Sequence, residues 1–498
     1  MVEKAKELTI DELASFCKRK GFAYSSGELY GGLSGFWDFG HLGVELVNNI
    51  KKAWWIHHVQ QRDDVVGIDG SIITNPKVWE ASGHVKNFVD VAVVCKKCGN
   101  KTKVDKHEVK TAKCDKCQGA YENLGEFNPM FTTQVGPVVK DSIKAYLRPE
   151  TAQSIFANFK LVYEHSRLRL PCGIAQVGKA FRNEIAPREF LFRSREFEQM
   201  ELEYFIAPGM PCPKEYLDEI RDVEIALYTQ EMQEKDGNSK VMKISDAFKK
   251  GIIKVDWHAY WLALEVKWFL HLGVRLEKLR ARQHTKDEKS HYAVDTWDLE
   301  YEFPMGWREL QGLANRGAYD LSQHEEHSKS SMAVVVDDST GKKVIPEVVC
   351  EPSLGVGRAF IVFMLEAYDQ DKKRENTVLH LNAKLAPYKA AVFPIISKDK
   401  QLELAKEIYK KLAREFSVIF DDSGSIGRRY ARNDEIGTPY CITIDEDSVK
   451  GKTVTIRDRD TTKQIRVKIA ELHNTLRDLL WGEVKFEKAG KVVETRVK

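Results

Sequence analysis

The residues most able to do chemistry lie in two neighbouring stretches near the middle of the chain. The first is Phe181-Arg182-Asn183-Glu184, and the second is Arg193-Ser194-Arg195-Glu196-Phe197-Glu198-Gln199-Met200-Glu201. Guanidinium groups match the oxygens of a phosphate, and an aromatic ring offers a purine a stacking surface. Gly355-Val356-Gly357-Arg358 supplies one more arginine after small residues. Together these segments predict an enzyme that binds ATP without a Walker loop.

A strand over residues 191–205 would gather much of this chemistry on one face. Side chains of a strand alternate between its faces, so one face here is polar and charged while the other is largely apolar. The polar face carries Arg193, Arg195, Phe197, Gln199, Glu201 and Glu203. A solvated face of an antiparallel sheet could have this composition, but the preceding strand also puts Arg182 and Glu184 on a common face. Two neighbouring strands therefore favour one shared pocket.

Three further segments add charged groups to the same region. Leu147-Arg148-Pro149-Glu150-Thr151-Ala152-Gln153 lies just upstream, and Trp307-Arg308-Glu309-Leu310-Gln311-Gly312 adds a carboxylate in strand-like sequence. Glu351-Pro352-Ser353-Leu354-Gly355 opens an apolar helix whose first turns contain Arg358. A salt bridge with a surface carboxylate is the alternative to a nucleotide contact for Arg358.

Two Cys-x-x-Cys pairs mark a separate insert over residues 92–120. Cys95 and Cys98 form the first pair, and Cys114 and Cys117 form the second. Four thiolates on two tight knuckles fill a tetrahedral zinc shell and leave no position for a catalytic water, so we expect structural Zn²⁺. An unmetallated thiol cluster is the alternative. The lysines that coat the insert fit either a solvated face or a contact with phosphate.

Aromatic and charged patterns organise the rest of the first 390 residues. Residues 43–59 form an expected helix whose Trp54 and Trp55 fit a buried core or a subunit interface. From about residue 209 the pattern becomes helical and charged, as in an accessory insertion.

Histidines elsewhere give little sign of a metal site. We expect the stretch from His284 to His291 to be exposed. His324 and His327 are expected to form a surface pair, because no third ligand is evident.

A compact α/β domain of the usual single-domain size, ~110 residues, begins after Leu385-Ala386-Pro387. A buried strand over 390–395 precedes an amphipathic helix over 404–416. Further strands are expected over 417–420, 440–444, 453–457 and 464–469, and a last helix over 470–480.

Composition restricts the class of protein. The chain has 498 residues and a formal net charge of +3, so the net charge neither demands nor excludes a nucleic-acid partner. We see no signal sequence and no apolar run of ~18 residues that could span a membrane. Nine cysteines, four of them clustered, fit a reducing cytoplasm better than a disulfide framework.

The charged segments resemble motifs 2 and 3 of class II aminoacyl-tRNA synthetases, and Pro76 fits the proline of motif 1. The finer similarity is to glycyl-tRNA synthetases of the homodimeric type, and it extends over nearly the whole chain. The segments that carry it are Trp79-Glu80-Ala81-Ser82-Gly83-His84, Arg148-Pro149-Glu150-Thr151-Ala152-Gln153, Phe197-Glu198-Gln199-Met200-Glu201, Ala314-Asn315-Arg316-Gly317 and Glu351-Pro352-Ser353.

The resemblance implies an α+β fold with several units. These are an antiparallel-sheet catalytic core (residues 1–91, 121–207 and 293–386), the zinc-ribbon insert (92–120), a helical insertion (208–292) and a C-terminal α/β anticodon-binding domain (387–498). It also implies a cytoplasmic homodimer that binds tRNA(Gly), glycine, and ATP with Mg²⁺, and that has no membrane segment.

The resemblance implies roles around ATP, residue by residue. Arg182 would hold the α-phosphate, Glu184 the adenine amino group, and Arg193, with Arg195 nearby, the γ-phosphate. Phe197 and Arg358 would stack on the two faces of adenine, and Glu309 would reach Mg²⁺. Catalysis would rest on Arg182, Glu309 and Arg358. The other ATP neighbours would be Asn183, Phe192, Leu310, Gly355 and Gly357.

For glycine, the resemblance implies a pocket in which Glu150, Glu201 and Glu351 surround the ammonium group and Ser353 closes the space. Phe197, Gln199 and Arg316 would be further neighbours. Several carboxylates around a small cavity favour an ammonium. Rejecting a substrate that lacks one methylene gives only ~1–3 kcal/mol, but glycine has no smaller competitor, so we expect no editing domain.

The implied reaction has two steps. The glycine carboxylate attacks the α-phosphorus and expels pyrophosphate, and the terminal adenosine of the tRNA then attacks the glycyl-adenylate. No histidine or cysteine is placed as an obvious base for the second step.

In the C-terminal domain, charged residues cluster around loops and strand ends. They fit either ordinary surface charge or a surface that contacts anticodon bases and flanking phosphates. The candidates for tRNA binding are Arg428, Arg429, Arg432, Asp434, Arg457, Asp458 and Arg459.

Two other functions compete with a glycine ligase. A catalytically silent relative would bind nucleic acid or a partner through the same fold, but such relatives typically lose the phosphate-binding arginines or the ammonium-binding carboxylates. A ligase for a different amino acid is the other, and the carboxylate-rich pocket argues against it.

Overall fold

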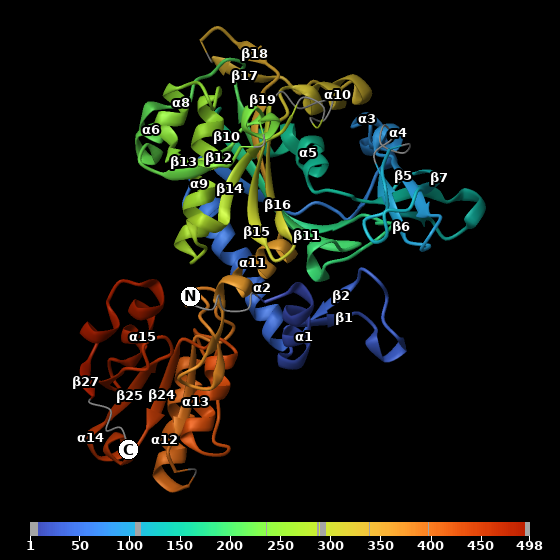
Figure 1. Cartoon of the computed structure of the whole chain (residues 1–498). Coiled ribbons are helices and arrows are strands. Elements are labelled where there is room, and N and C mark those ends of the chain that lie inside the picture. Colours follow the sequence, from blue (N-terminus) through green and yellow to red (C-terminus); the bar gives the residue numbers. More distant parts are fainter. Residues whose placement is uncertain are drawn as a thin grey trace.

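The computed structural model describes residues 8–104, 111–235, 237–285, 288, 295–337, 339–396 and 398–493. A large body contains most of the chain, and the C-terminal residues form a smaller body beside it (Figure 1). Among the described helices, none has the length and apolar character needed to cross a membrane.

A nine-stranded sheet runs through the large body. In spatial order its strands are β13 (Lys240–Lys243), β12 (Glu224–Tyr228), β14 (Leu279–Gln283), β15 (Asp295–Phe303), β16 (Gly306–Asn315), β19 (Glu347–Gly355), β11 (Glu196–Ile206), β10 (Cys172–Phe181) and β3 (Val65–Ile68). The strands from β14 to β10 pair antiparallel with their neighbours, which confirms the predicted antiparallel core. Parallel pairs occur only toward the edges, between β12 and β14 and between β10 and β3.

The two faces of this sheet are covered differently. Helices α2 (His41–Trp55), α9 (Asp256–His271) and α11 (Val356–Ala367) share one large core with even-numbered side chains of β11 such as Leu202. Helices α5 (Ala152–His165) and α10 (Tyr319–Ser328) belong to the opposite face, where Phe205 packs on Phe159 with ring centroids 4.5 Å apart. The odd-numbered polar side chains of β11 therefore point to the face of α5.

The segment 208–292 is not the purely helical insertion that its charge pattern predicted. It holds α6 (Lys214–Ile220), α7 (Gln230–Glu234), α8 (Ile244–Lys249) and α9, but also β12, β13 and β14, which lengthen the main sheet. Trp257 and Trp261 of α9 are 1% and 0% exposed in the main core. Because α9 is buried on nearly all sides, its sequence lacks the polar stripe of a surface helix.

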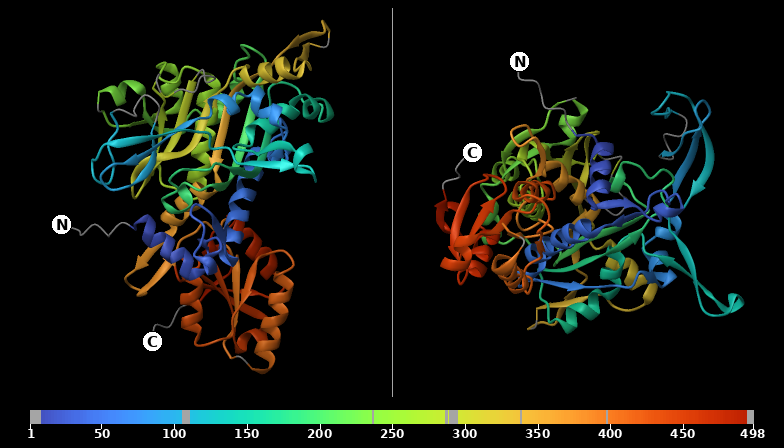
Figure 2. Two further views of the ribbon diagram at one scale, coloured as in Figure 1. Left: turned by 90° about the vertical axis from the view of Figure 1, so that its right-hand side faces the viewer. Right: turned by 90° about the horizontal axis from the view of Figure 1, so that it is seen from below.

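Two small sheets extend from the large body. The cysteine insert is a three-stranded antiparallel sheet of β5 (Asp90–Cys95), β6 (Lys101–Val104) and β7 (Tyr121–Phe127), somewhat wider than residues 92–120. It projects away from the C-terminal body (Figures 1 and 2). The second sheet joins β4 (Ile73–Thr74), β8 (Thr132–Val135) and β9 (Ile143–Leu147).

The N-terminal elements lead into the helix that precedes Pro76. They are α1 (Ile10–Lys20), β1 (Ala23–Ser25), η1 (Glu28–Tyr30), β2 (Trp37–Phe39), α2 and its π-helical continuation η2 (Ile56–Gln60). The helix predicted over residues 43–59 is thus confirmed, and Trp54 is 0% exposed in the core. Pro76 is the first residue of α3 (Pro76–Ala81), where its missing N–H costs no helical bond, and α4 (His84–Asn87) follows.

In chain order, one hairpin precedes β19 and another follows α11. One pairs β17 (Val334–Asp337) with β18 (Lys342–Val344), and the other pairs β20 (Tyr368–Asp371) with β21 (Asn376–Leu379). The β20–β21 hairpin lies next to the C-terminal body.

The C-terminal body is the predicted α/β domain. Its six-stranded sheet has the order β23 (Val418–Phe420), β22 (Ala390–Pro394), β24 (Tyr440–Ile444), β25 (Thr453–Asp458), β26 (Gln464–Lys468) and β27 (Lys491–Val493). Its helices are α12 (Asp399–Leu412), α13 (Ile426–Glu435), α14 (Glu446–Gly451) and α15 (Leu472–Trp481). The predicted strands and both predicted helices are confirmed, whereas α13 was expected as loop.

Candidate active site

The connection between β10 and β11 carries the arginines, not the strands themselves. β11 begins at Glu196 instead of residue 191, and the short helix η4 (Phe190–Phe192) precedes it. Glu189 and Phe190 have φ values of 62° and 57°, a left-handed conformation that ends an extended strand. The predicted shared strand faces for Arg182, Glu184, Arg193 and Arg195 are therefore wrong.

Hydrogen bonds nevertheless bring most of these groups together. The backbone N–H of Arg182 donates to the carbonyl of Arg195 (2.9 Å), and Arg195 Nε donates to the carbonyl of Glu184 (3.0 Å). Arg182 Nε donates to the carbonyl of Pro149 (2.9 Å), and its guanidinium lies 5.5 Å from the ring centre of Phe197. These contacts hold the β10–β11 connection as one turn beside the segment that contains Glu150. The turn brings together Arg182, Glu184, Arg195 and Phe197.

Arg358 and Glu309 meet on the other side of this turn. Arg358 Nη1 lies 2.9 Å from Glu309 Oε1, and the Arg358 guanidinium lies 4.7 Å from the ring centre of Phe192. Gly357 lets α11 approach η4, since a Cβ there would come 2.7 Å from the carbonyl oxygen of Leu191. The predicted stack of Arg358 therefore has a ring partner, Phe192, within the protein itself.

The remaining predicted nucleotide neighbours contribute in different ways. Leu310 is 0% exposed and belongs to the main core, so its side chain does not reach the pocket. Asn183 is fixed through its backbone N–H, which donates to the carbonyl of Pro129 (2.8 Å). Arg193 is half-buried, and Gly355 ends β19 immediately before α11.

The pairing of β11 with β19 builds the predicted glycine pocket. Glu201 lies opposite Ser353, and Gln199 lies opposite Gly355. Ser353 Oγ donates to Glu201 Oε1 (2.7 Å), and the hydroxyl of Thr151 donates to the other carboxylate oxygen of Glu201. Gln199 Nε2 donates to Ser353 Oγ (3.3 Å). A residue of β19 and the residue that precedes α5 thus both donate to one buried carboxylate on β11.

Arg316 holds the second part of this pocket. Its Nη1 donates to Glu351 Oε1 (3.0 Å), and its Nε and Nη2 donate to Asp320 at 2.7 and 3.0 Å. Glu150 Oε2 lies 3.3 Å from His84 Nε2. Glu150, Glu201, Glu351, Ser353 and Arg316 are therefore gathered in one region, as the sequence predicted.

Opposing charges divide these carboxyl groups into two kinds. Burial would raise the pKa of Glu150, but the charges of His84, Arg316 and Arg182 outweigh it and hold that pKa below its usual range. Burial, followed by the charge of Glu150, raises the pKa of Glu201. Burial also raises the pKa of Glu351, to about 8. Two like charges ~4 Å apart repel by ~4 kcal/mol at an effective dielectric constant of ~20, so carboxylates this close favour a cationic ligand.

Arg182 connects the two halves of the site. Its charge helps to lower the pKa of Glu150, and it also helps Arg358 to lower the pKa of Glu309. A guanidinium whose charge acts on both the carboxylate-lined pocket and the Arg358–Glu309 pair suits an anion joined to a small ammonium compound. The arrangement can therefore bring an amine-bearing carboxylate up to a phosphate.

Sequence reasoning assigned no role to several residues at this site. Thr151 and His84 were quoted only as members of segments, although each contacts a predicted carboxylate. Asp320 pairs with Arg316, four residues earlier in the chain, but Arg316 precedes α10, so helical spacing gives no signal for this contact. Glu203 shared the polar face of β11 but was assigned nothing.

The four predicted zinc ligands are brought together. One atom from each of Cys95, Cys98, Cys114 and Cys117 lies within 4.8 Å of the others. The Cys95–Cys117 and Cys98–Cys114 sulfur distances are 3.4 and 3.5 Å. Sulfurs around a tetrahedral zinc with Zn–S bonds of ~2.3 Å are ~3.8 Å apart, so the four thiols fit this ion.

Two histidine predictions are wrong. His284 is not freely exposed, because its Nε2 lies 2.6 Å from Asp298 Oδ2; His291 lies outside the described residues. His324 is 6% exposed, and its Nε2 lies 3.0 Å from Gln153 Oε1. Only His327 of that pair is exposed, because α10 turns the face of His324 toward α5.

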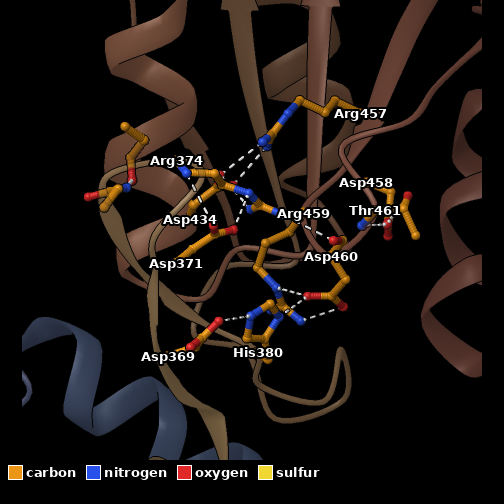
Figure 3. Close-up of polar contacts among 12 residues, drawn as sticks. Asp369, Asp371, Arg374, His380, Asp434, Arg457, Asp458, Arg459, Asp460 and Thr461 are labelled. Carbon is orange, nitrogen blue, oxygen red and sulfur yellow. Dashed lines mark hydrogen bonds and ion pairs between the residues drawn. The ribbon is translucent and has the colours of Figure 1, made fainter. Parts of the chain in front are cut away.

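Most of the predicted tRNA-binding residues lie inside the C-terminal domain or at its joint with the large body (Figure 3). Arg457 donates to both oxygens of Asp434 at 2.8 and 2.9 Å, and Arg374 of the β20–β21 hairpin donates to Asp434 at 3.1 Å. Arg459 donates to Asp460 and to the carbonyls of Gly437 and Leu381. These contacts connect the two bodies.

Burial decides which of these residues can meet a partner. Arg429, Asp434, Arg457 and Arg459 are 3%, 2%, 7% and 2% exposed, so the expectation of an open RNA-binding surface is wrong for them. Several of their interactions join residues distant in sequence, as for Arg429, whose Nη1 donates to the carbonyl of Pro394 (2.5 Å). The residues that stay accessible are Arg428 and Arg432, which are exposed, and Asp458, which is half-buried.

Comparisons with protein families agree with this architecture. Residues 138–429 match the model of the tRNA synthetase class II core domain (G, H, P, S and T), and residues 389–479 match the anticodon binding domain. A prolyl-tRNA synthetase from Cryptosporidium parvum, solved with halofuginone and AMPPNP, has a similar fold, with a TM-score of 0.57 and 15% identity over 96% of this chain and 79% of its own.

Curated relatives are similar over almost their whole length. The glycine–tRNA ligase of Treponema denticola is 40% identical over 476 residues, which cover 94% of this chain and 96% of the relative. The glycine–tRNA ligase of Geobacillus thermodenitrificans is 42% identical over 496 residues, covering 93% and 96%.

Proposed function

The chain belongs to the glycine–tRNA ligase family of class II aminoacyl-tRNA synthetases, and from that premise we propose which residues carry out its reaction. It attaches glycine to tRNA at the expense of ATP, through a glycyl-adenylate. The observation that carries the residue assignment is Arg182, whose Nε donates to the carbonyl of Pro149, next to Glu150 in the chain, and whose charge helps to lower the pKa of both Glu150 and Glu309.

In the activation step, one glycine carboxylate oxygen forms a bond to the α-phosphorus of ATP, and the bond from that phosphorus to the pyrophosphate oxygen breaks. Arg182 contacts the α-phosphate and stabilises the charge that develops on its oxygens. Arg193 and Arg195 contact the leaving pyrophosphate. Phe197 stacks on adenine, Arg358 covers the opposite face, and Glu184 accepts from the adenine amino group.

Mg²⁺ would arrive with ATP and neutralise phosphate charge. Glu309 fits a magnesium contact, since Mg²⁺ is usually held by one or two carboxylates together with substrate phosphates. The Glu309 side chain is 48% exposed and faces the nucleotide residues through its pair with Arg358. Asp298 lies close by, and burial raises its pKa to about 6.

The glycine ammonium lies among Glu150, Glu201 and Glu351, and Ser353 limits the space beside it. Gln199 fixes the Ser353 hydroxyl, and Arg316 fixes the Glu351 carboxylate. A side chain larger than hydrogen would meet these packed groups, whereas glycine leaves them undisturbed. Selection against larger amino acids then comes from filled space, and no editing step is required.

In the transfer step, the 3′-hydroxyl of the terminal adenosine attacks the glycyl carbonyl, and AMP leaves with its phosphate oxygen.

Arg428 and Arg432 of α13, together with Asp458, supply the accessible part of the proposed anticodon contact. The buried members of the predicted set act instead by holding the domain that presents this surface.

Structural Zn²⁺ bound by Cys95, Cys98, Cys114 and Cys117 would fix the three-stranded insert. This insert lies near the β10–β11 connection, since Lys103 Nζ is 3.9 Å from Glu184 and Arg188 Nη1 is 3.8 Å from Asp115. Ordering the insert would therefore also restrain the nucleotide-binding turn.

A homodimer is the proposed assembly. The sheet of β4, β8 and β9 exposes apolar side chains: Ile73 and Val135 are each 49% exposed, and Ile143 is 62% exposed. Val135 lies opposite Ile143, so both are on one face, as in an interface. Sedimentation of the Val135→Lys, Ile143→Lys double variant should show monomer, whereas Leu161→Lys, which changes a side chain that is 54% exposed on the outer side of α5, should remain dimeric.

The state of the cysteines supports a cytoplasmic location. None of the nine, all of which lie in the described part of the chain, forms a disulfide, as expected in a reducing compartment.

Pyrophosphate exchange with a panel of amino acids tests the function. Exchange with glycine alone is expected. Exchange with another amino acid would contradict the pocket assignment, and no exchange at all would indicate a catalytically silent relative. Nothing in the site favours that alternative, because Arg182, Arg358, Glu150, Glu201 and Glu351 are all in place.

A further inference from the structure

Glu203 is a buried carboxyl group to which the reaction above assigns no task. It lies on β11 two residues after Glu201 and is 0% exposed. Within the described part of the chain, neither of its carboxylate oxygens has a hydrogen-bond partner. An isolated ionised carboxylate is costly to bury, so this position needs a physical explanation.

Strand register places Glu203 in the glycine pocket. Glu201 lies opposite Ser353, and Tyr204 lies opposite Cys350, so the same register puts Glu203 opposite Glu351. One oxygen from each of Glu201, Glu203 and Glu351 lies within 4.8 Å of the other two. On the other side, β10 presents Ile174 to Glu203, and its side chain offers no hydrogen-bond donor.

The charges that face Glu203 are mostly negative. They are those of Glu351 on β19, Glu201 on β11, Asp320 on α10 and Arg316 after β16, and the thiol of Cys350 lies on the same strand as Glu351. Arg316, the cation of this set, already donates to Asp320 and Glu351. Three ionised carboxylates at this separation would repel one another in a buried space, so the cluster holds at least one proton.

Hydrogen bonds identify the group that carries this proton. Glu201 accepts from Ser353 and from Thr151, and Glu351 accepts from Arg316, so donors stabilise both as carboxylates. Glu203 accepts from no donor among the described residues. Because donors lower the pKa of a carboxyl group, the proton resides on the group that has none.

We propose that Glu203 is a positioning residue of the glycine pocket: it carries a proton, donates it in a hydrogen bond toward Glu351, and releases it to solvent when the glycine ammonium binds. This rests on the proposed function, which puts the ammonium beside Glu201 and Glu351. One positive charge enters as one proton leaves, so the net charge of the pocket stays constant and the carboxylates are held apart at the spacing that an ammonium needs.

Titration agrees with this geometry. Burial, followed by the charge of Glu351, holds the pKa of Glu203 well above its usual range. Burial also raises the pKa of Glu351, but the charge and hydrogen bond of Arg316 oppose this rise, so Glu203 is the member of the pair that holds the proton. A proton is therefore retained at neutral pH. An ammonium between these groups lowers the pKa of both, so binding drives proton release and not uptake.

Calorimetry with 5′-O-(glycylsulfamoyl)adenosine, an unreactive adenylate analogue, tests the proposal. Titrations at pH 7 in buffers of different ionisation enthalpy count the protons released on binding. Wild type should release about one proton more than Glu203→Gln, which keeps the size and a donor but cannot titrate. Glu198→Gln is the matched control, because Glu198 is on the same strand but pairs with Lys51, 3.0 Å away; its proton count should equal that of wild type.

An equal proton count in wild type and Glu203→Gln would overturn the proposal. Should Glu203→Gln fail to fold, as judged by circular dichroism, difference infrared spectra of wild type give the same answer: the carbonyl stretch of a protonated carboxylic acid should disappear when the analogue binds. Its persistence would equally contradict the proposal.

Glu351→Gln separates this inference from the function on which it depends. If the analogue binds that variant as tightly as wild type, the pocket assignment itself fails. If Glu351→Gln weakens binding but Glu203→Gln leaves the proton count unchanged, only the role of Glu203 is refuted. A KM for glycine that depends on pH in wild type and not in Glu203→Gln, at similar kcat, would support a positioning role over a purely structural one.

Discussion

Arg358 Nη1 lies 2.9 Å from Glu309 Oε1, so the arginine assigned to adenine and the carboxylate assigned to Mg²⁺ are partners of each other. The pair fixes one side of the guanidinium, and the ring of Phe192, 4.7 Å away, supports its face. In the proposed mechanism Arg358 would contact adenine and Glu309 would contact Mg²⁺, and each also orients the other.

Glu309→Gln should remove a metal contact and loosen Arg358 at the same time. Glycine-dependent pyrophosphate exchange should fall by on the order of 10²–10³ in kcat/KM for ATP, the size of effect expected for one preorganised electrostatic contact. The Mg²⁺ concentration for half-maximal rate should rise, and KM for glycine should stay near wild type. Glu302→Gln is the control. Glu302 lies on β15, next to the strand that carries Glu309, and its carboxylate pairs with Lys278. An unchanged Mg²⁺ dependence would refute the role of Glu309.

Arg182→Ala should separate chemistry from folding. Its side chain touches the Phe197 ring and the Pro149 carbonyl, but much of the turn is held by backbone bonds. Single-turnover adenylate formation should fall on the order of 10²–10³, while the thermal midpoint changes little. Lys substitution should recover only part of the rate, because an ammonium cannot form two parallel bonds to a phosphate. Normal activation in the alanine variant would exclude Arg182 from the α-phosphate.

Asp434→Asn should affect stability first. Asp434 is 2% exposed and accepts from Arg457 and Arg374. The change leaves the buried guanidinium of Arg457 without its counter-charge, whereas Arg374 keeps Asp371 as a partner. Breaking a buried ion pair costs about 3–5 kcal/mol, which should appear as a lower urea midpoint for the C-terminal domain. Asp447→Asn, on the exposed face of α14, should leave the midpoint unchanged.

Arg428 gives the matching test of RNA contact. Arg428→Ala should raise KM for tRNA and reduce the salt dependence by about one unit of slope, if one phosphate contact is lost. Stability and pyrophosphate exchange should stay at wild-type values, because Arg428 is exposed. If Asp434→Asn instead raised KM for tRNA without any loss of stability, this would show that the joint between the two bodies contacts the RNA.

The sequence predicted the glycine pocket better than the nucleotide turn, and local periodicity explains the difference. Phe197, Gln199 and Glu201 obey strand alternation, which needs no knowledge of distant residues. Arg182 lies in a connection that the left-handed residues Glu189 and Phe190 separate from β11, and Arg193 follows the short helix η4 before β11 begins. The residue types Glu and Phe do not indicate a left-handed conformation.

Long-range pairing accounts for the other errors. Arg457 and Asp434 are 23 residues apart, and Arg374 and Asp434 are 60 apart. The charged residues of the C-terminal domain were therefore predicted to form an RNA-binding surface. Tertiary contacts instead place several of them at the joint between the two bodies. The strands of segment 208–292 were missed for a similar reason, since they become regular only by joining the edge of the main sheet.

Removing zinc should disorder the insert before it affects the rest of the chain. Cys98→Ser should lower bound zinc from about one per chain toward zero, because a structural tetrahedral site needs its four ligands. Proteolysis within residues 90–127 should accelerate, and activation should fall less than in Arg182→Ala, because the insert touches the turn only through pairs such as Lys103–Glu184. Cys212→Ser, a buried thiol outside the cluster, is the control. Metal analysis that finds no zinc in wild type would refute the site.

The joint between the two bodies should depend on pH through His380. His380 Nδ1 lies 2.7 Å from Asp460 Oδ1, and this hydrogen bond is the main cause of the raised pKa of His380. A pKa that is higher in the folded than in the unfolded protein stabilises the fold below the ordinary histidine value of ~6.5, and this contribution disappears as pH rises through the folded value. Burial opposes ionisation of Asp460, but His380 and Arg459 lower the pKa of Asp460. The stabilisation that Asp460 contributes is therefore present above its pKa in the unfolded protein and is lost only in acid.

The His380→Gln variant should therefore be less stable than wild type near pH 6 and approach it above pH ~8. Thermal midpoints from pH 5.5 to 8.5 measure this difference, and a gap that stays constant across that range would show that His380 contributes through packing and not through its charge.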